Sequence, residues 1–430
     1  MSADRAPGGR QRAARPVVRS IRVGILATVV VFVVLAISAG GYSAYALTQP
    51  LPTINAVLEP LQPTTTPDAT VTVPGYGAAA IGEQDAPGTL LAGSQLDTLH
   101  PIASLTKVIT ALVVLDAHPI VGAGGGETIT LTPQDARRVA EYRAIDGVTA
   151  PAPAGLTISQ RSIIELMLVV SANNYADTLA VWAFGSVDAY VDAANAWLGR
   201  SGLTGITVGD ATGFSSANTA TPRALLDLAR LALENPVVAA ATALPVIGVA
   251  GIGQFENRNP VLGVDGITGM KTGTTDAAGS CLLFSAESDE AGEVVRLVGV
   301  ILDGPSGAVV GADVRALLAS VRDDYTRVDL ATKDDILARY EAPWGDTAEL
   351  RVTEGASAVA WGATTSRSVI PAPPLRAGET PSAQEMMVRL GDEQVRVGLR
   401  WSGAISMPDL EWRLTEPLRE WGILPTEPGR

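Results

Sequence analysis

The sequence is poor in cysteine and histidine, which limits the chemistry open to it. A single cysteine, Cys281, stands among 430 residues, so no disulfide can form within the chain. The two histidines, His100 and His118, are too few for a histidine-rich metal site or a facial triad. A Ser-His-Asp triad needs only one histidine, and the count leaves it open, although both histidines lie in segments that read as loops.

Lysine is also scarce, although cationic residues are not. The chain has 28 arginines and only three lysines, Lys107, Lys271 and Lys333. A lysine ammonium can lose its proton when it is desolvated, whereas an arginine guanidinium effectively cannot. A lysine retained in such an arginine-rich chain therefore indicates a position where the ammonium itself matters.

The charge is unevenly distributed along the chain. Residues 1–22 carry six arginines and one aspartate, a charge of +5, so the remainder accounts for −19 of the total of −14. Because binding to a phosphate backbone needs a basic face, this acidic body argues against a nucleic-acid partner.

One long apolar run lies near the N-terminus. Residues 23–47 contain no charged side chain and are long enough to cross a membrane. The arginines before them predict a cytoplasmic basic tail over 1–22 and a membrane anchor over 23–47 in a bacterial cell membrane. The remainder of the chain would then lie on the extracytoplasmic face. The alternative is a secreted protein released by signal-peptide cleavage near Ala46, because Ala44-Tyr45-Ala46 has the A-x-A form.

The composition and residue pattern of the rest of the chain change twice. Residues 48–74 are rich in proline and threonine, which predicts an extended linker. Residues 75–328 interleave helical and strand patterns, which predicts an α/β (α+β) domain with helices packed on an antiparallel sheet. Residues 329–430 hold short alternating segments and five of the seven tryptophans, which predicts a small all-β domain.

Several elements of residues 75–328 can be placed from local patterns. Apolar spacing predicts a helix over 105–116 and two helices within 157–184 that meet at Ser171–Asn174. Pro222 marks the first turn of another helix within 219–235. Residues 279–288 and 294–304 read as paired strands of a hairpin.

Three short motifs follow one another in this region. They are Ser104-Leu105-Thr106-Lys107 at a helix start, Ser171-Ala172-Asn173 between two helices, and Lys271-Thr272-Gly273 before a strand. This order of S-x-x-K, S-x-N and K-T-G is typical of β-lactamases and penicillin-binding proteins.

The first motif suits a nucleophile and its base. Positions three apart lie on one face of a helix, so the amine of Lys107 can reach the hydroxyl of Ser104. A serine needs a base to take its proton, and a free lysine, with a pKa of about 10.4, is too strongly protonated near neutral pH. Burial and a nearby cation, which Lys271 could supply, would lower that pKa to about 7–8. Gly273 would let a substrate backbone approach the strand edge.

Taken alone, each motif has an ordinary structural explanation. Ser104 could cap a helix, Ser171–Asn173 could end one, and Lys271–Gly273 could be a strand followed by a turn. Their order, together with two of the three lysines of the chain, favours an active site instead.

Longer stretches around these motifs resemble the serine-type D-Ala-D-Ala carboxypeptidases, the low-molecular-mass penicillin-binding proteins of the peptidase S11 family. The resemblance is strong over about 75–325 and loose in the β domain; it rests on residues 101–116, 171–180, 210–229, 257–286 and 412–417. It implies the penicillin-binding/β-lactamase-like serine transferase fold, and an enzyme that needs no metal or organic cofactor.

The resemblance also implies a mechanism. Ser104 would attack the penultimate carbonyl of a peptidoglycan stem peptide that ends in D-Ala-D-Ala, while Lys107 takes its proton. The oxyanion would lie between the backbone N–H groups of Ser104 and Thr274, and Ser171 would relay a proton to the leaving amine. Penicillins mimic this substrate, so β-lactams should acylate the same serine.

The remaining implied roles concern binding. Asn173 would hold the acyl side of the substrate, and Lys271, Thr272 and Thr274 would bind its terminal carboxylate. Arg258 matches a family arginine and would add to that anion site; its ordinary explanation is a structural ion pair.

Two positions depart from the family pattern. Thr274 stands where the family often has histidine after K-T-G; its backbone N–H survives the change, but the carboxylate contact can differ. Asn174 stands where aspartate often follows S-A-N, which could remove a local salt bridge with little expected effect on catalysis.

Three alternatives remain open from the sequence. A DD-endopeptidase would use the same chemistry on a cross-linked substrate. A class A β-lactamase would also need a deacylating glutamate after the S-x-N, and no E-x-x-L-N stretch is found; Glu165 precedes that motif. A wall-binding scaffold with a dead site is disfavoured by the intact Ser104, Lys107 and Lys271.

Overall fold

The computed structural model describes residues 17–379 and 381–425, which form two compact units. The central unit comprises Thr65–Val328 and Val359–Thr364. The terminal unit comprises the described residues up to Thr64, Asp329–Ala358, and those from Thr365 onward. The boundary falls within two paired strands, β14 (Tyr325–Ala331) and β17 (Ala356–Trp361).

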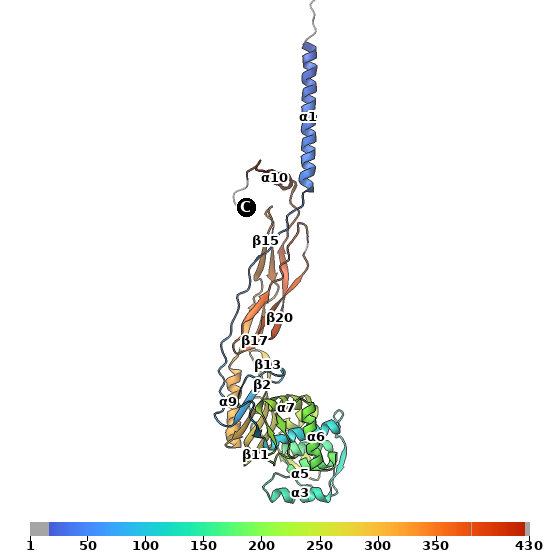
Figure 1. Cartoon of the computed structure of the whole chain (residues 1–430), viewed down its shortest axis with the longest axis vertical. Helices are drawn as coiled ribbons and strands as arrows, with labels where there is room; N and C mark the ends of the chain where they lie inside the picture. Colours follow the sequence, from blue (N-terminus) through green and yellow to red (C-terminus); the bar gives the residue numbers. More distant parts are fainter. Residues whose placement is uncertain (1–16, 380, 426–430) are drawn as a thin grey trace, which may run out of the picture. The chain divides into compact units, whose positions relative to one another are not determined.

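A five-stranded antiparallel sheet forms the middle of the central unit (Figure 1). Its longest strands are β12 (Gly279–Glu290) and β13 (Glu293–Gly304). They are joined by a two-residue turn, Ala291–Gly292, in which both φ angles are positive, as a type I′ hairpin turn requires. The predicted hairpin is therefore confirmed, with longer strands and a tighter turn than the sequence pattern indicates. In spatial order the strands are β11 (Ile267–Thr275), β12 (Gly279–Glu290), β13 (Glu293–Gly304), β2 (Ala78–Glu83) and β3 (Ala92–Ser94).

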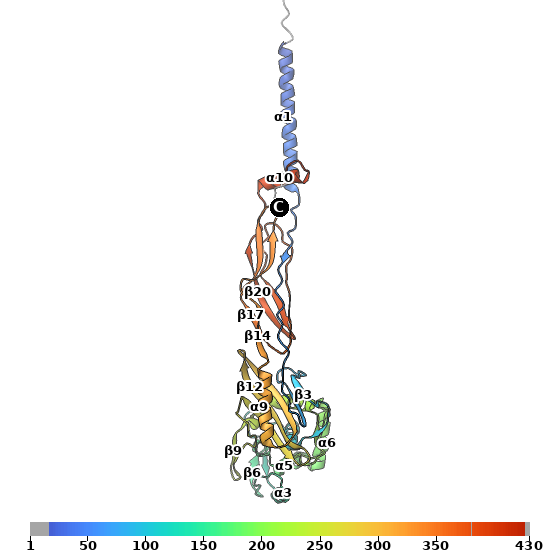
Figure 2. The same cartoon turned by 90° about the vertical axis from the view of Figure 1, so that its left-hand side faces the viewer.

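Helices cover both faces of this sheet, as expected for the α/β (α+β) class. On one face α9 (Gly307–Arg322) lies against β12 and β13, with Leu317 and Phe284 in the same apolar cluster (Figure 2). On the other face α7 (Pro222–Glu234) and α8 (Pro236–Ala243) contact the strands. The predicted start of α7 is confirmed, because Pro222 is its first residue and Thr221 caps it.

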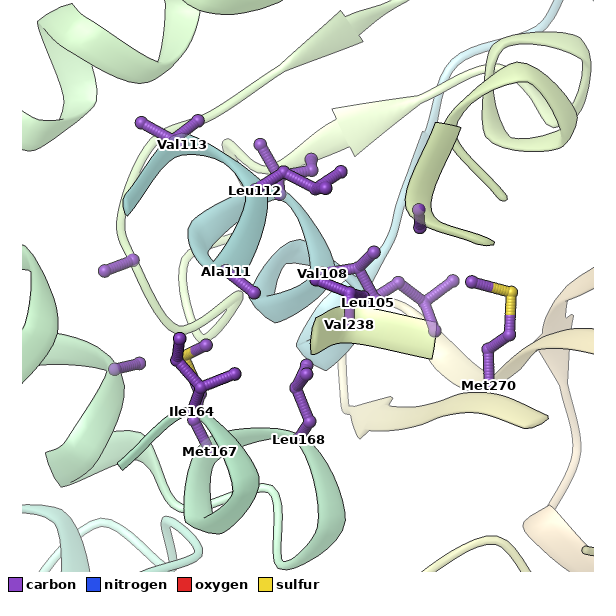
Figure 3. Close-up of a cluster of buried hydrophobic side chains, with 14 of the residues drawn as sticks. Leu105, Val108, Ala111, Leu112, Val113, Ile164, Met167, Leu168, Val238 and Met270 are labelled. Atoms are coloured by element: carbon purple, nitrogen blue, oxygen red, sulfur yellow. The ribbon is translucent and has the colours of Figure 1, made fainter. Parts of the chain in front are cut away.

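A buried helix, α2 (Thr106–Ala117), runs through the larger core cluster. In Figure 3 its side chains, among them Val108 and Ala111, lie among apolar side chains of α4 (Gln160–Val169), α8 and β11. All of its first ten residues are buried, so its position is fixed from every side. The two helices predicted within 157–184 are α4 (Gln160–Val169) and α5 (Asn173–Phe184).

The central unit has further helices and strands besides these. The helices are η1 (Ala103–Leu105), α3 (Pro133–Arg143) and α6 (Val187–Arg200). The strands are β4 (His100–Pro101), β5 (Thr128–Thr130), β6 (Thr157–Ser159), β7 (Ile206–Thr207), β8 (Thr219–Ala220), β9 (Val246–Val249) and β10 (Gly253–Glu256).

The terminal unit is built on a six-stranded antiparallel sheet. Its strands are, in spatial order, β1 (Val57–Leu58), β15 (Ile336–Glu341), β16 (Thr347–Val352), β20 (Glu393–Gly403), β19 (Gln384–Leu390) and β18 (Ser366–Val369). A helix that the sequence pattern did not predict, α10 (Leu410–Glu420), follows the last strand. Trp361, one of the five tryptophans assigned to the β domain, belongs to the central unit, where its indole N–H donates to the Val321 carbonyl.

The expectation that residues 48–74 form a plain extended spacer is wrong for part of that segment. Strand β1 pairs with β15, and the buried Ile54 forms a bridge with Leu375. The linker therefore supplies an edge strand to the terminal unit, because the open edge of β15 offers backbone groups that an extended segment can pair with.

The N-terminal helix, α1 (Val17–Thr48), includes the predicted anchor. Residues 23–48 are long and apolar enough to cross a membrane. Four of the six arginines of the predicted basic tail lie outside the described residues. At its other end α1 contacts α10 and the residue that follows it: the Tyr42 hydroxyl donates to the Leu414 carbonyl (2.5 Å), and the Tyr45 ring lies 5.5 Å from that of Trp421.

Candidate active site

Ser104 lies in a tight turn immediately before α2. The turn is the 3-10 segment η1, and its first residue, Ala103, has a left-handed backbone with φ of 46°. Two hydrogen bonds hold it: the Ile102 N–H donates to the Asn218 carbonyl (3.0 Å), and the Thr106 hydroxyl donates to the Ala103 carbonyl (2.9 Å). The turn thus presents a half-buried serine at the start of a buried helix.

The side chain of Lys107 is completely buried and surrounded by acceptors. Its Nζ lies 2.8 Å from Ser104 Oγ, 2.7 Å from Asn173 Oδ1 and 2.5 Å from the carbonyl oxygen of Thr212. Burial lowers the pKa of Lys107 to about 7; the carboxylates of Asp210 and Asp177 oppose that shift, and Arg258 adds to it. The predicted meeting of Ser104 and Lys107 is therefore present, with a lysine able to be neutral near neutral pH.

The protonation state of Lys107 decides what this arrangement can do. A neutral amine has two N–H groups and one lone pair. If the two N–H groups donate to the Asn173 side-chain oxygen and the Thr212 carbonyl, which are acceptors only, the lone pair faces the Ser104 hydroxyl. That is the orientation a general base needs.

The second motif lies between α4 and α5. Ser171 has φ of 65°, an unusual conformation for a residue other than glycine, and it lines the same cleft as Ser104. Asn173 begins α5; its N–H donates to the Val148 carbonyl (2.8 Å), and its side-chain oxygen accepts from Lys107. Strain at Ser171 fits a functional position, because the surrounding structure must hold it there.

Asn174, one of the two departures from the family pattern, has a clear structural partner. It is fully buried, accepts from the Ala150 N–H and donates to the Ala150 carbonyl, both at 3.1 Å. An aspartate could not donate the second bond, so asparagine fits this environment.

The third motif lies on β11, which contacts the Ser104 turn. Lys271 is buried, and its Nζ donates to the Thr272 carbonyl (2.8 Å). Burial, and then the positive charges of Lys107 and Arg258, hold the pKa of Lys271 well below its usual value. The cation that lowers the pKa of Lys107 is therefore Arg258 rather than Lys271, because the ammonium of Lys271 is itself destabilised by burial.

Gly273 has a different neighbour from the one expected. A Cβ at this position would lie 2.8 Å from the Ser104 backbone nitrogen and 3.0 Å from Ala103 Cβ. The glycine therefore lets β11 approach the Ser104 turn, whereas the sequence pattern assigned that space to a substrate backbone. The next residue, Thr274, is exposed, with its hydroxyl 3.3 Å from that of Ser280.

A cleft of about 350 Å³ joins these parts. It brings together Ser104, Ser171 and the K-T-G strand, with the N-terminus of α9 in its wall. The exposed Arg258 also lines it and forms no ion pair with any residue that the structure describes, so the structural explanation of this arginine is not supported. The lining residues are Ser104, Val148, Ser171, Arg258, Pro260, Thr272, Gly273, Thr274, Cys281, Leu282, Gly307, Ala308 and Val310.

Sequence reasoning missed one part of the site, the loop that starts at Asp210. Its Thr212 carbonyl is the third acceptor around Lys107. The D-A-T-G run carries a detectable turn signal, since aspartate side chains accept from backbone N–H groups two residues on. The pattern does not reveal that this turn lies against a lysine 105 residues earlier. Glu165, which precedes the second motif, is half-buried on α4, and burial raises its pKa.

Comparison with protein families gives a match over most of the central unit. The sequence profile of peptidase S11, described as D-alanyl-D-alanine carboxypeptidase, matches residues 76–306, which include all three motifs.

Curated relatives carry two different activity names. A D-alanyl-D-alanine endopeptidase of Pseudomonas aeruginosa is 30% identical over 220 residues, which are 48% of this chain and 66% of that protein. The D-alanyl-D-alanine carboxypeptidase DacB2 of Mycobacterium tuberculosis is 30% identical over 197 residues, which are 44% and 64% of the two chains. The alignments thus span slightly less than two thirds of these relatives.

Several solved structures have a fold similar to that of this chain. The Streptomyces K15 DD-transpeptidase aligns with a TM-score of 0.51 at 22% identity, over 58% of this chain and 98% of its own. The D-alanyl-D-alanine carboxypeptidase DacD of Francisella tularensis aligns with a TM-score of 0.54 at 20% identity, over 79% and 95% of the two chains. At this identity the likeness shows the fold, and the predicted penicillin-binding fold is confirmed.

Proposed function

The chain belongs to the peptidase S11 family of D-alanyl-D-alanine carboxypeptidases, and from this premise we propose that it is a penicillin-binding serine DD-peptidase that removes the terminal D-alanine from peptidoglycan stem peptides. The observation that carries the proposal is the buried Lys107 amine 2.8 Å from the Ser104 hydroxyl, beside a cleft lined by the other two motifs. A buried lysine that can be neutral can act as the adjacent base that a serine nucleophile needs, in place of a histidine.

In the proposed reaction Lys107 takes the hydroxyl proton as Ser104 Oγ attacks the carbonyl of the penultimate D-alanine. The tetrahedral oxyanion is held by the backbone N–H groups of Ser104 and Thr274. Collapse breaks the peptide bond, and the proton reaches the leaving amine through Ser171. Water then cleaves the ester, and the serine regains its proton.

Binding uses the other cleft residues. Asn173 holds the acyl part of the substrate with its amide. The terminal carboxylate lies against Thr272, Thr274 and Arg258, with Lys271 behind them. An arriving carboxylate favours the charged form of Lys271, so binding offsets the burial that lowers the pKa of this lysine.

Fluorescent penicillin tests the proposal directly. The parent chain should form a covalent adduct, and the Ser104→Ala variant should form none. Ser186→Ala is a matched control, because it removes the hydroxyl that caps α6 and leaves the cleft untouched; it should label like the parent. A parent chain that takes no label contradicts the proposal. An adduct that hydrolyses in seconds rather than minutes favours a β-lactamase instead.

The second candidate is a DD-endopeptidase, which the relatives of that name in Pseudomonas aeruginosa and Escherichia coli favour. Purified muropeptides distinguish the two activities. Release of free D-alanine from monomeric pentapeptides supports the carboxypeptidase, whereas conversion of cross-linked dimers to monomers without that release supports the endopeptidase.

We also propose that α1 is retained as a membrane anchor, with the catalytic domain on the extracytoplasmic face. The contacts at the end of α1 support this, because cleavage after Ala46 would remove Tyr42 and Tyr45, which contact α10 and its C-terminal neighbour Trp421. The mass of the protein isolated from membranes tests it. A mature chain that begins at Leu47 contradicts retention.

A further inference from the structure

The loop Asp210–Asn218 lies against the nucleophile turn and the base. The Thr212 carbonyl accepts from Lys107, and the Asn218 carbonyl accepts from the Ile102 N–H. Gly213 approaches so closely that a Cβ on it would lie 1.8 Å from the Ala103 carbonyl oxygen. Its φ of 81° also favours glycine. The loop is therefore packed against the catalytic residues, and its shape determines their surroundings.

One side chain determines that shape. The Asp210 carboxylate accepts from the N–H groups of Thr212 (2.7 Å), Gly213 (2.6 Å) and Ser215 (2.7 Å), and from the Thr212 hydroxyl (3.1 Å). Four donors on one carboxylate fix the peptide planes on both sides of Thr212. The direction of the Thr212 carbonyl is fixed with them, because a peptide unit is planar.

That direction matters for the base. The neutral amine of Lys107 points its lone pair at Ser104 only while both of its N–H groups have acceptors elsewhere. Asn173 Oδ1 is one acceptor, and the Thr212 carbonyl is the other. If the carbonyl turned away, an amine N–H would be free to point at the serine, and the lone pair would be misdirected.

We infer that Asp210 is a positioning residue for the acylation step: it holds the Thr212 carbonyl so that the lone pair of Lys107 faces the Ser104 hydroxyl. This rests on the proposed function, since it assigns a role within the same reaction. Asp210 acts through Thr212, and the substrate does not need to touch it.

Asp210 also acts through its charge. Three charged groups shift the pKa of Lys107: Asp210, Asp177 of α5 and Arg258. A fourth group, Lys271 of β11, has its own pKa lowered by the charge of Lys107. The two carboxylates raise the pKa of Lys107, and Arg258 lowers it. Removing the Asp210 charge should therefore lower the pKa of Lys107, provided that the lysine stays buried. A loosened loop that admits water should raise this pKa, because burial is what lowers it.

These opposite signs make a decisive test. The full chain in detergent is acylated with fluorescent penicillin, and the second-order rate constant is measured against pH for the parent, Asp210→Asn and Asn218→Ala. Asn218→Ala is the matched control. Its amide holds the same loop through Gly209, Asp210 and Ser215, but it is uncharged and does not orient Thr212 directly.

The acylation rate constant should fall at low pH, where Lys107 is protonated (the acid limb), and level off at higher pH (the plateau). For Asp210→Asn we expect the plateau to fall by about 10- to 100-fold, the scale of a small misplacement of a catalytic group. We also expect the acid limb to move to lower pH. Asn218→Ala should leave the limb in place or move it to higher pH. The inference is overturned if Asp210→Asn keeps the parent plateau, or if its limb moves to higher pH as in a loosened loop.

A second variant tests the inference if Asp210→Asn does not fold. If Asp210→Asn lacks the circular dichroism of the parent, Asp210→Glu carries the test, because it keeps the charge and displaces the carboxylate by one methylene. Its plateau should fall with the limb unmoved; an unchanged plateau overturns the inference. A parent chain that forms no adduct is a failure of the proposed function and is seen before any variant is compared.

Discussion

The side-chain nitrogen of Lys107 lies 2.8 Å from the hydroxyl oxygen of Ser104, and no part of the lysine is exposed to solvent. Burial lowers the pKa of the lysine to about 7, so a basic amine and a protonated serine can coexist near neutral pH. This relationship connects the fold to the chemistry, because α2 is held on every side by core residues and carries the lysine into the interior.

Lys107→Arg should severely impair acylation. A guanidinium keeps its proton and offers donors only, so it cannot accept the serine proton. We expect penicillin acylation and D-alanine release to fall by about 10²- to 10⁴-fold, the usual contribution of general base catalysis. The exposed Lys333→Arg is the control and should behave like the parent. Retained D-alanine release in Lys107→Arg would rule out the lysine as the base.

The acylation rate should titrate with a pKa of about 7. The neutral amine is the active form, so kcat/KM should rise roughly tenfold per pH unit below that value and level off above it. The measurement is the pH profile of penicillin acylation of the free enzyme. An acid limb near the ordinary lysine pKa of about 10.4 would mean that the lysine is not desolvated in solution.

The sequence was sufficient to predict the parts of the site that depend on local spacing. Ser104 and Lys107 are three residues apart on one helical turn, and helix periodicity brings them together. The meeting of α4 and α5 near Ser171, and the β12–β13 hairpin, also follow from short-range patterns. The prediction that the three motifs share one cleft needed the family resemblance, because no local pattern encodes the distances between them.

The features that the sequence did not reveal depend on distant contacts. Thr212 meets Lys107 across 105 residues, and Gly273 meets the Ser104 turn rather than a substrate. Likewise, nothing local shows that the proline-rich linker supplies β1 to an edge of the terminal sheet. Such pairings are decided by the tertiary structure, and neighbouring residues carry no signal for them.

Gly273→Ala should impair acylation without unfolding the chain. Its Cβ would lie 2.8 Å from the Ser104 nitrogen and 3.3 Å from the Ile102 carbonyl oxygen, and backbone atoms cannot move aside as a side chain could. We expect up to about a 100-fold loss of the acylation rate constant, since small displacements at the nucleophile are costly. The stability loss should be about 1–3 kcal/mol, as for overpacking.

The matched control for that change is Gly199→Ala. Gly199 lies in α6, and a Cβ added there would have no neighbouring atom within 4 Å, so alanine should leave acylation unchanged and slightly raise the melting temperature. Equal acylation by Gly273→Ala and the parent would show that β11 can shift freely against the turn.

Arg258→Ala should weaken recognition of a free carboxylate and shift the pH profile. The guanidinium lines the cleft without an ion pair to any described residue, so it is available to a substrate anion. Losing a charge-assisted hydrogen bond of about 1.5–3 kcal/mol lowers kcat/KM for a D-Ala-D-Ala peptide by roughly 10- to 100-fold. The same peptide with an amidated C-terminus should be affected far less.

Because Arg258 also lowers the pKa of Lys107, its removal should move the acid limb to higher pH. Arg315→Ala, which removes an exposed partner of Asp265, is the control and should change neither quantity. An equal loss on the free and amidated peptides would assign Arg258 a purely structural role.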